Sequence, residues 1–154
     1  MILYFAYGSN MNMERLCERL GREGHQLLDR RRATLHDYRL VFNKRSSLEA
    51  QVGYANIEPS VSGVVEGTLN EMSEAALALL DRIELVPHHY RRVPVHVHDW
   101  GRASTVLAWT YLGQPAMLCP EVRPTRDYIG HLLQAGDVLP AHYLGRLAEV
   151  ECCR

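Results

Sequence analysis

The balance of strand-like and helix-like segments is what most constrains the fold of this 154-residue chain. Runs rich in Val, Ile, Tyr, Phe and Thr that end in Gly, Pro, Ser or Asn are typical of strands. They lie at residues 2–7, 38–42, 52–57, 63–69, 90–98 and 104–112. Helical spacing recurs at residues 13–20, 73–84 and 125–135, and a fourth helix is expected to begin at Pro140. These helices are too few to connect a parallel sheet, because every parallel crossover needs its own connection.

The segments therefore predict an α+β fold: a curved or closed mixed β-barrel of about six strands with flanking α-helices. The composition is compatible with this fold, since 47% hydrophobic and 23% charged residues can build a proper core at this length. We expect a single domain over residues 1–154, because no repeat, linker or low-complexity stretch divides the sequence.

The charge pattern favours a small-molecule partner. A net charge of −1 gives no long-range attraction for nucleic acid or an anionic membrane. The one dense basic run, Arg30–Arg32, is flanked by acids and is interpreted as a solvated face. No segment resembles a transmembrane span or a signal peptide, and the four cysteines have no zinc spacing. We expect a cytoplasmic protein, as a monomer or homodimer, without nucleic-acid or membrane partners.

The first predicted strand ends in the turn Tyr7-Gly8-Ser9-Asn10, and a helix follows at once. This helix is expected to bury the face that carries Met13, Leu16, Cys17 and Leu20. A strand that turns into a helix N-terminus leaves backbone N–H groups unpaired, which suits a carboxylate or phosphate. The alternative is an ordinary strand-to-helix turn, because small polar residues favour such turns for local reasons. The turn lacks the Lys and further glycines of a nucleotide-binding loop.

Two histidines share one face of the strand at 90–98. His96 and His98 could bind a metal ion, but a third ligand at suitable spacing is not evident. Alternating valines on the opposite face explain the pattern as a half-exposed strand. We therefore expect neither a metal site nor a cofactor.

Glu84 breaks the pattern of the helix at 73–84. Projected at about 100° per residue, Glu84 falls between Leu77 and Leu80 on the apolar arc, so its side chain is expected to point inward. An inward carboxylate is costly unless it is paired, hydrogen-bonded or protonated, and desolvation raises its pKa toward the range useful for proton transfer. The alternative is that the helix ends early, before Pro87, and leaves Glu84 in water.

These two features together suggest proton-transfer chemistry on a small acid. Ser9 is interpreted as a backbone donor or hydroxyl contact and not as a nucleophile, because the turn does not match a G-x-S-x-G elbow and no neighbouring base is evident.

The motifs, taken in chain order, resemble the landmarks of the gamma-glutamylcyclotransferase-like family, including its AIG2-like and gamma-glutamylamine cyclotransferase relatives. The segments that carry the resemblance are Tyr4–Met11, Gly63–Gly67, Leu80–Glu84 with Tyr90, Pro124–Tyr128, and Gln134–Tyr143. Leu85 stands where the family often has glycine, and the turn is unlike that of the glutathione-dedicated branch.

The resemblance implies a mixed β-barrel in which Tyr7, Gly8, Ser9 and Asn10 bind a glutamyl moiety and Glu84 is the catalytic acid/base. Tyr90 and Tyr128 correspond to tyrosines that line the family's pocket. The implied reaction needs no metal: the free α-amine attacks the γ-carbonyl, forms 5-oxoproline and releases an amine. A hydrolase of γ-glutamyl amides and a non-catalytic binding module stay open as alternatives, and the sequence does not identify the leaving amine.

Overall fold

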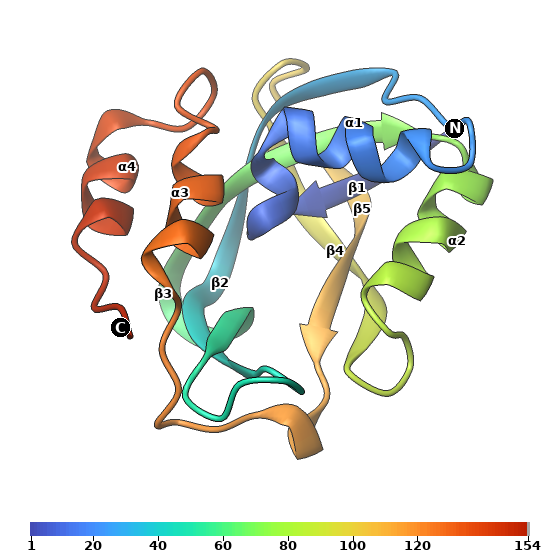
Figure 1. Cartoon of the computed structure of the whole chain (residues 1–154). Coiled ribbons are helices and arrows are strands. Elements are labelled where there is room, and N and C mark those ends of the chain that lie inside the picture. Colours follow the sequence, from blue (N-terminus) through green and yellow to red (C-terminus); the bar gives the residue numbers. More distant parts are fainter. Residues whose placement is uncertain (154) are drawn as a thin grey trace.

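Five strands close into a barrel in the computed structural model, which describes residues 1–153 (Figure 1). They are β1 (Ile2–Ala6), β2 (Asp29–Arg45), β3 (Gly53–Met72), β4 (Tyr90–Asp99) and β5 (Ser104–Gly113). Their order around the barrel is β1-β3-β2-β4-β5. The closing pair, β1 with β5, is parallel, and the other pairs are antiparallel. The predicted α+β mixed barrel is confirmed.

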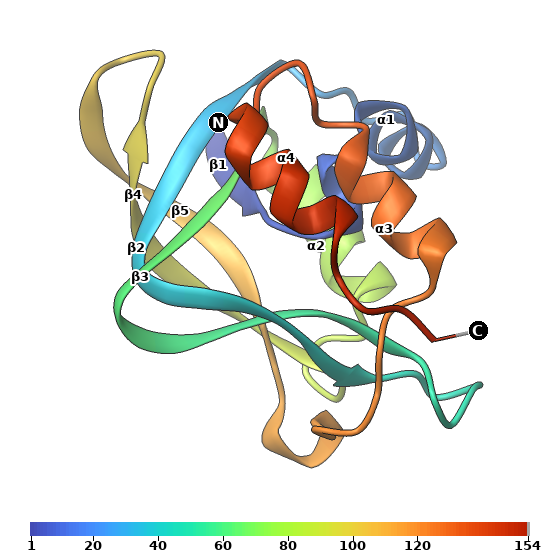
Figure 2. The ribbon, with the colours of Figure 1, turned by 90° about the vertical axis from the view of Figure 1, so that its left-hand side faces the viewer.

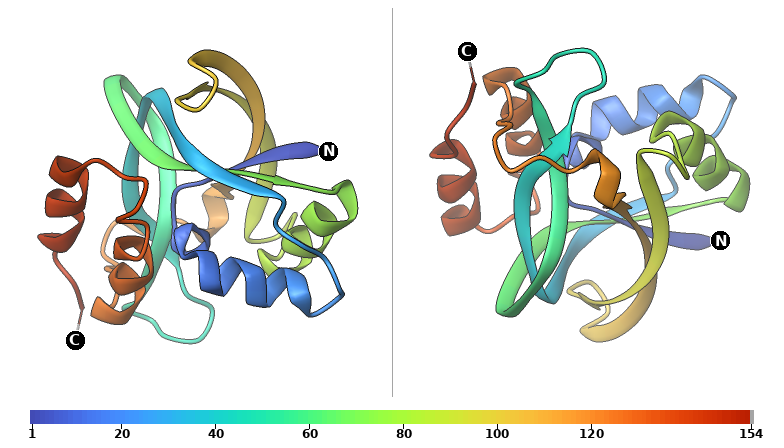
Figure 3. Two further views of the ribbon diagram at one scale, coloured as in Figure 1. Left: turned by 90° about the horizontal axis from the view of Figure 1, so that it is seen from above. Right: turned by 90° about the horizontal axis from the view of Figure 1, so that it is seen from below.

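The helices flank the barrel, with α3 and α4 on one side and α1 and α2 on the other (Figure 3, left). They are α1 (Met13–Gly21), α2 (Glu74–Ile83), α3 (Arg126–Leu133) and α4 (Ala141–Ala148). Side chains of Asn12, Ser73 and Thr125 cap the first three by accepting a backbone N–H. Short 3-10 turns lie at η1 (Ser9–Met11) and η2 (Pro115–Met117). Within residues 1–153, no helix is both long and apolar enough to cross a bilayer.

The strand count is five and not six, because residues 52–57 and 63–69 belong to one strand, β3. This strand pairs with β2 along its length, and the pairing shifts register between His36 and Tyr38. At this bulge Asp37 and Ser62 have positive φ, and the Ser62 N–H donates to the Asp37 carboxylate at 3.2 Å. The Ser and Gly residues here therefore bend a continuous ribbon, visible in Figure 2, where a strand boundary was predicted.

The basic run is not a solvated face, and that interpretation is wrong. Residues 29–36 belong to β2 and pair with β3. This pairing places the three arginine side chains next to acidic residues. The ion pairs are Arg30 with Asp137 at 2.7 Å, Arg31 with Asp99 at 2.8 Å, and Arg32 with Glu66 at 3.2 Å. The three arginine side chains are 6%, 15% and 28% exposed, respectively.

The buried face of α1 is narrower than predicted. Leu16 and Leu20 are fully buried, but Met13 and Cys17 are exposed. The flank next to the buried stripe carries Arg15 and Arg19, which are half-buried. Long basic side chains can lay their aliphatic stems on apolar surface while the charged head meets polar groups, which explains their place here.

The strand that holds the two histidines is half-exposed, as predicted. In β4 the side chains of Val95 and Val97 are buried, His96 is exposed and His98 is half-buried. Among residues 1–153, no group of three or more His, Cys, Asp and Glu side chains is arranged to hold a metal ion.

Candidate functional site

The chain leaves β1 through a tight turn at one end of the barrel. The Met11 N–H donates to the Gly8 carbonyl at 3.0 Å, and the Asn12 N–H to the Ser9 carbonyl at 3.1 Å. The 3-10 turn η1 thus separates the strand from α1, where a direct passage was expected. Within the described residues, the N–H groups of Gly8, Ser9 and Asn10 have no backbone acceptor, and that of Ser9 is directed at the Tyr128 hydroxyl.

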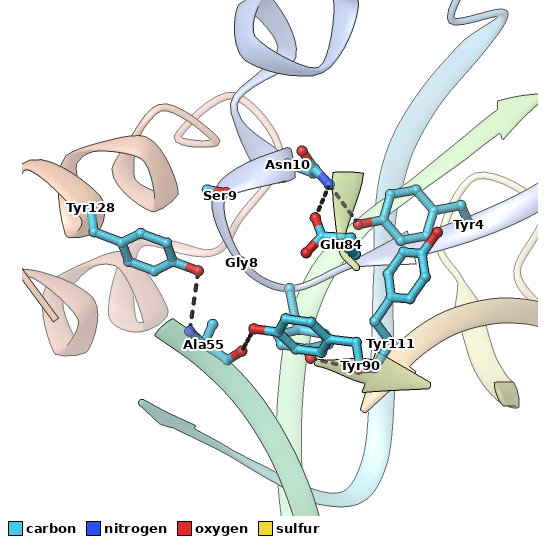
Figure 4. Close-up of a pocket in the computed structure, with 10 residues that line it drawn as sticks. Tyr4, Gly8, Ser9, Asn10, Ala55, Glu84, Tyr90, Tyr111 and Tyr128 are labelled. Atoms are coloured by element: carbon cyan, nitrogen blue, oxygen red, sulfur yellow. Dashed lines mark hydrogen bonds between the residues drawn. The ribbon is translucent and has the colours of Figure 1, made fainter. Parts of the chain in front are cut away.

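Glu84 stands at the C-terminal end of α2. The helix ends at Ile83, and the Glu84 N–H still donates to the Leu80 carbonyl at 2.8 Å. The next residue, Leu85, has positive φ, so the chain leaves the helical path there. The helix thus ends before Pro87, but the carboxylate does not lie in open water. Its side chain is 21% exposed and faces a cavity beside the first turn (Figure 4).

This cavity, here called the tyrosine cavity, has a volume of about 40 Å³. All seven residues proposed from the sequence line it: Tyr7, Gly8, Ser9, Asn10, Glu84, Tyr90 and Tyr128. Three further residues line it that were not proposed: Tyr4, Ala55 and Tyr111. Five different elements of the fold, β1, η1, β3, β4 and β5, thus converge with the ends of α2 and α3 on one small space.

A short chain of hydrogen bonds fixes the polar groups around the carboxylate. The Asn10 side-chain N–H group donates to Glu84 Oε1 at 3.3 Å and to the Tyr4 hydroxyl at 3.0 Å. Arg19 Nη1 donates to Asn10 Oδ1 at 2.8 Å and lies 3.5 Å from Glu84 Oε1. Because Arg19 can only donate, it orients the Asn10 amide so that its nitrogen faces Glu84.

Burial raises the pKa of Glu84, although four neighbouring groups oppose the shift. Arg19, Lys44, Asn10 and Arg15 each favour the ionised carboxylate and lower its pKa, but desolvation is the larger effect. A carboxyl group with a raised pKa can accept and return a proton at a pH closer to neutral than an ordinary glutamate.

Of the five tyrosine hydroxyls at the cavity, that of Tyr111 donates to the Asp81 carboxylate at 2.7 Å, and the other four divide into two kinds. Those of Tyr7 and Tyr90 donate to backbone carbonyls, of Tyr111 at 2.6 Å and of Ala55 at 2.9 Å, respectively. Those of Tyr4 and Tyr128 accept hydrogen bonds, and within residues 1–153 neither has an acceptor for its own proton. Burial raises the pKa of Tyr128 to about 12, so this hydroxyl stays protonated at neutral pH. These two hydroxyls can donate to an oxygen atom in the cavity.

Gly8 lets the turn approach Tyr128 closely. A Cβ at this position would lie 3.0 Å from the Tyr128 hydroxyl oxygen and 3.1 Å from the Ala55 Cβ. The Ala55 N–H donates to the same hydroxyl at 3.1 Å, so β3, α3 and the first turn meet at one point. Any larger residue would have to displace Tyr128 or the turn.

A second cavity of about 230 Å³ adjoins the first and is here called the cationic cavity. The two share Ser9, Glu84, Tyr90 and Tyr128. Arg15, Arg19 and Lys44 bring positive charge to its wall. Sequence reasoning missed all three, and the only local signal was that Arg15 and Arg19 are spaced i, i+4 on one helix flank.

Known proteins resemble the chain in sequence pattern and in fold. A family model described as "Gamma-glutamyl cyclotransferase, AIG2-like" matches residues 4–130. A solved structure titled "Gamma-glutamyl cyclotransferase" is 25% identical, with a TM-score of 0.82, over 99% of this chain and 89% of that one. A human protein titled "uncharacterized protein loc79017" is 26% identical, with a TM-score of 0.81, over 99% of this chain and 89% of that one. No curated protein matches the chain.

Proposed function

We propose that this chain, which belongs to the gamma-glutamyl cyclotransferase, AIG2-like family, cleaves γ-glutamyl amides to 5-oxoproline and a free amine. The observation that supports this most strongly is the Glu84 carboxylate. It lies largely buried in the tyrosine cavity, beside a turn whose N–H groups have no backbone acceptor within the described residues. A buried carboxylate next to backbone and hydroxyl donors matches the needs of a substrate that carries both an amine and a carboxylate.

The reaction turns the substrate on itself. The α-amine nitrogen attacks the γ-carbonyl carbon, a five-membered lactam closes, and the bond from that carbon to the leaving nitrogen breaks. The attacking nitrogen loses a proton and the leaving nitrogen gains one, so the atoms balance without water. The same ring closure would be strained for a β-aspartyl amide, and an α-linked glutamyl peptide has no free amine at the right place.

Glu84 is proposed to carry both proton transfers. It accepts the proton from the α-amine as a base and returns it to the leaving nitrogen as an acid. Such a positioned group contributes about 10²–10⁴-fold in rate. Its raised pKa suits both halves of this task, because a carboxyl group that titrates closer to neutral pH can both accept a proton and return it there.

Substrate positioning is expected to contribute more than proton transfer. Orientation of the reacting atoms within one molecule is worth roughly 7–11 kcal/mol, and here a flexible glutamyl chain must fold into a near-ring. The N–H groups of Gly8–Asn10 are proposed to hold the α-carboxylate or the developing oxyanion. Tyr7 and Tyr90 form the wall, and Tyr128 adds a hydroxyl donor.

Two other functions make different predictions about the product. A hydrolase in the same cavity would release glutamate, and a binding module would release nothing. A module would have no use for a carboxylate held among tyrosines, since burial of that group costs free energy. A small-molecule partner, with which the net charge of −1 agrees, and a cytoplasmic location are part of this proposal.

The test is product analysis on γ-glutamyl amides in metal-free buffer. We expect wild-type protein to release 5-oxoproline and the Glu84→Gln variant to lose about 10²–10⁴-fold in rate. Glu74→Gln is the matched control, because Glu74 lies exposed at the other end of the same helix. Release of glutamate in place of 5-oxoproline, or equal rates for the two variants, would contradict the proposal.

A further inference from the structure

The cationic cavity holds more positive charge than its own carboxylate can balance. Arg15, Arg19 and Lys44 line it, and Glu84 is the one acidic residue among its lining residues. Arg19 is the cation that lies in ion-pair distance of Glu84, at 3.5 Å. Within residues 1–153, neither Arg15 nor Lys44 has a carboxylate within ion-pair distance. Two cations therefore face the cavity without an acid.

Lys44 is the more unusual of the two, because it is only 4% exposed. Its Nζ lies 2.6 Å from Nδ1 of His89, and 5.5 Å and 5.3 Å from the ring centres of Tyr54 and Tyr90. Burial and the neighbouring lysine lower the pKa of His89, so the imidazole is neutral and accepts from the ammonium group. An ammonium has three donors, and His89 satisfies one of them.

Arg15 also has unused hydrogen-bonding capacity. Its Nε is buried and lacks a hydrogen-bond partner within the described chain. An unsatisfied buried N–H costs free energy, and a guanidinium is shaped to hold a carboxylate with two parallel hydrogen bonds. Arg15 and Lys44 come from different elements, α1 and β2, yet both meet the same cavity.

The place of Glu84 decides which part of the substrate reaches these cations. Glu84 lines both cavities, so an amide bond that receives its proton from Glu84 lies at the junction. The glutamyl end then occupies the tyrosine cavity, next to the N–H groups of the first turn. The leaving amine extends into the cationic cavity, whose 230 Å³ is below the ~300–1,000 Å³ of sites for drug-sized ligands.

We infer that the leaving amine carries a carboxylate, and that Arg15 and Lys44 bind it. This inference rests on the proposed function and names its substrate class: γ-glutamyl amino acids and short γ-glutamyl peptides. Plain alkylamines offer these cations nothing to pair with. Polyamines and other cationic amines would bring like charge against them, which is unfavourable in a partly buried site.

A matched pair of substrates isolates the carboxylate. γ-Glutamyl-glycine and γ-glutamyl-glycinamide differ at the leaving end only by a carboxylate and a neutral amide. We expect kcat/KM to favour γ-glutamyl-glycine by about tenfold or more, the value of a hydrogen bond to a charged group. In Arg15→Gln this preference should fall toward unity. Arg22→Gln is the control and should keep it, because Arg22 lies exposed at the end of the same helix.

Two results would overturn the inference. One is an equal or greater kcat/KM for the glycinamide or for a γ-glutamyl diamine. The other is an equal loss on both matched substrates in Arg15→Gln, which would mean that Arg15 holds a group they share, such as the α-carboxylate.

Failure of the proposed function can be told apart from failure of this inference. If wild-type protein releases 5-oxoproline from no substrate, the proposed function is wrong. Calorimetric titration of the two matched ligands into Glu84→Gln then decides the inference by itself. The inference is supported if Glu84→Gln binds γ-glutamyl-glycine more tightly than γ-glutamyl-glycinamide and the double variant with Arg15→Gln does not. Equal affinities of Glu84→Gln for the two ligands overturn the inference.

Discussion

Two groups of cations in this molecule have opposite surroundings. Arg30–Arg32 are adjacent in the sequence, and in β2 each lies against at least one carboxylate from another part of the chain. Lys44 is far in the sequence from Arg15 and Arg19, yet the three share one cavity and one carboxylate. The basic run ties β2 to β3, to β4 and to the loop before α4, whereas the cations of the cavity leave charge available to a ligand. Pairing, and not density along the sequence, distinguishes a structural cation from a binding one.

The largest effect is expected from a substitution that breaks an ion pair of the basic run Arg30–Arg32. Asp99 is fully buried and accepts from Arg31 Nε at 2.9 Å and from Arg31 Nη2 at 2.8 Å. Arg31→Ala leaves this carboxylate without its cation, so the free energy of unfolding should fall by about 3–5 kcal/mol in urea titrations. Arg39→Ala is the control and should cost less than about 1 kcal/mol, because the Arg39–Glu58 pair is exposed. Similar losses in the two variants would contradict the distinction.

The same pair predicts a pH dependence of stability. The hydrogen bond from Arg31 holds the pKa of Asp99 below its usual range, about 3.9 for an unfolded chain. The pair therefore stabilises the fold above that pH, and the contribution is lost as pH falls through the lowered pKa. We expect the gap in unfolding free energy between wild type and Arg31→Ala to narrow in acid. A gap that stays constant or widens would contradict this sign.

A smaller effect is expected at Arg19, in the group of cations that lines the cavity. Arg19 lowers the pKa of Glu84, so Arg19→Gln should raise it further. Glu84 must be ionised to accept the first proton. The fall of kcat/KM on the acid side of its pH profile should therefore occur at higher pH in this variant. The loss of rate in Arg19→Gln should therefore be larger in mild acid than in mild alkali. Arg22→Gln, at the exposed end of α1, is the control and should leave the pH profile of kcat/KM unchanged.

The smallest expected effect concerns the stability of the site itself. Glu84→Gln removes a largely buried charge and keeps the shape of the side chain, so the melting temperature should stay the same or rise slightly. Thermal unfolding of purified variant and wild type checks this. A fall of several degrees would instead mark Glu84 as part of the structural framework, like Asp99.

Local pattern indicated an inward Glu84, while it left open a helix that ends early and places Glu84 in water. A helix projects its residues at fixed angles, so an acid between Leu77 and Leu80 faces their side if the helical path continues to Glu84, which caps α2. The first turn was predictable for a similar reason, because a strand, a glycine and a helical pattern follow one another within a few residues. Both features depend on neighbours in sequence.

The cations and the remaining tyrosines depend on pairing between distant segments. Lys44 reaches the site only because β2 bends at its bulges, and Tyr111 only because β5 closes the barrel against β1. Register between strands sets which side chains meet, and local pattern along a single sequence does not reveal that register. The same limit explains the merged strand β3, since Ser and Gly mark a bulge as readily as a turn.

The most direct test of the central claim follows the oxygen atoms of the product. A γ-glutamyl amide is incubated with wild-type protein in water enriched in heavy oxygen, and the products are weighed by mass spectrometry. Attack by the α-amine predicts 5-oxoproline of unchanged mass and no labelled glutamate. Glutamate that carries one heavy oxygen in its side-chain carboxylate would show that water is the nucleophile, and would contradict the account.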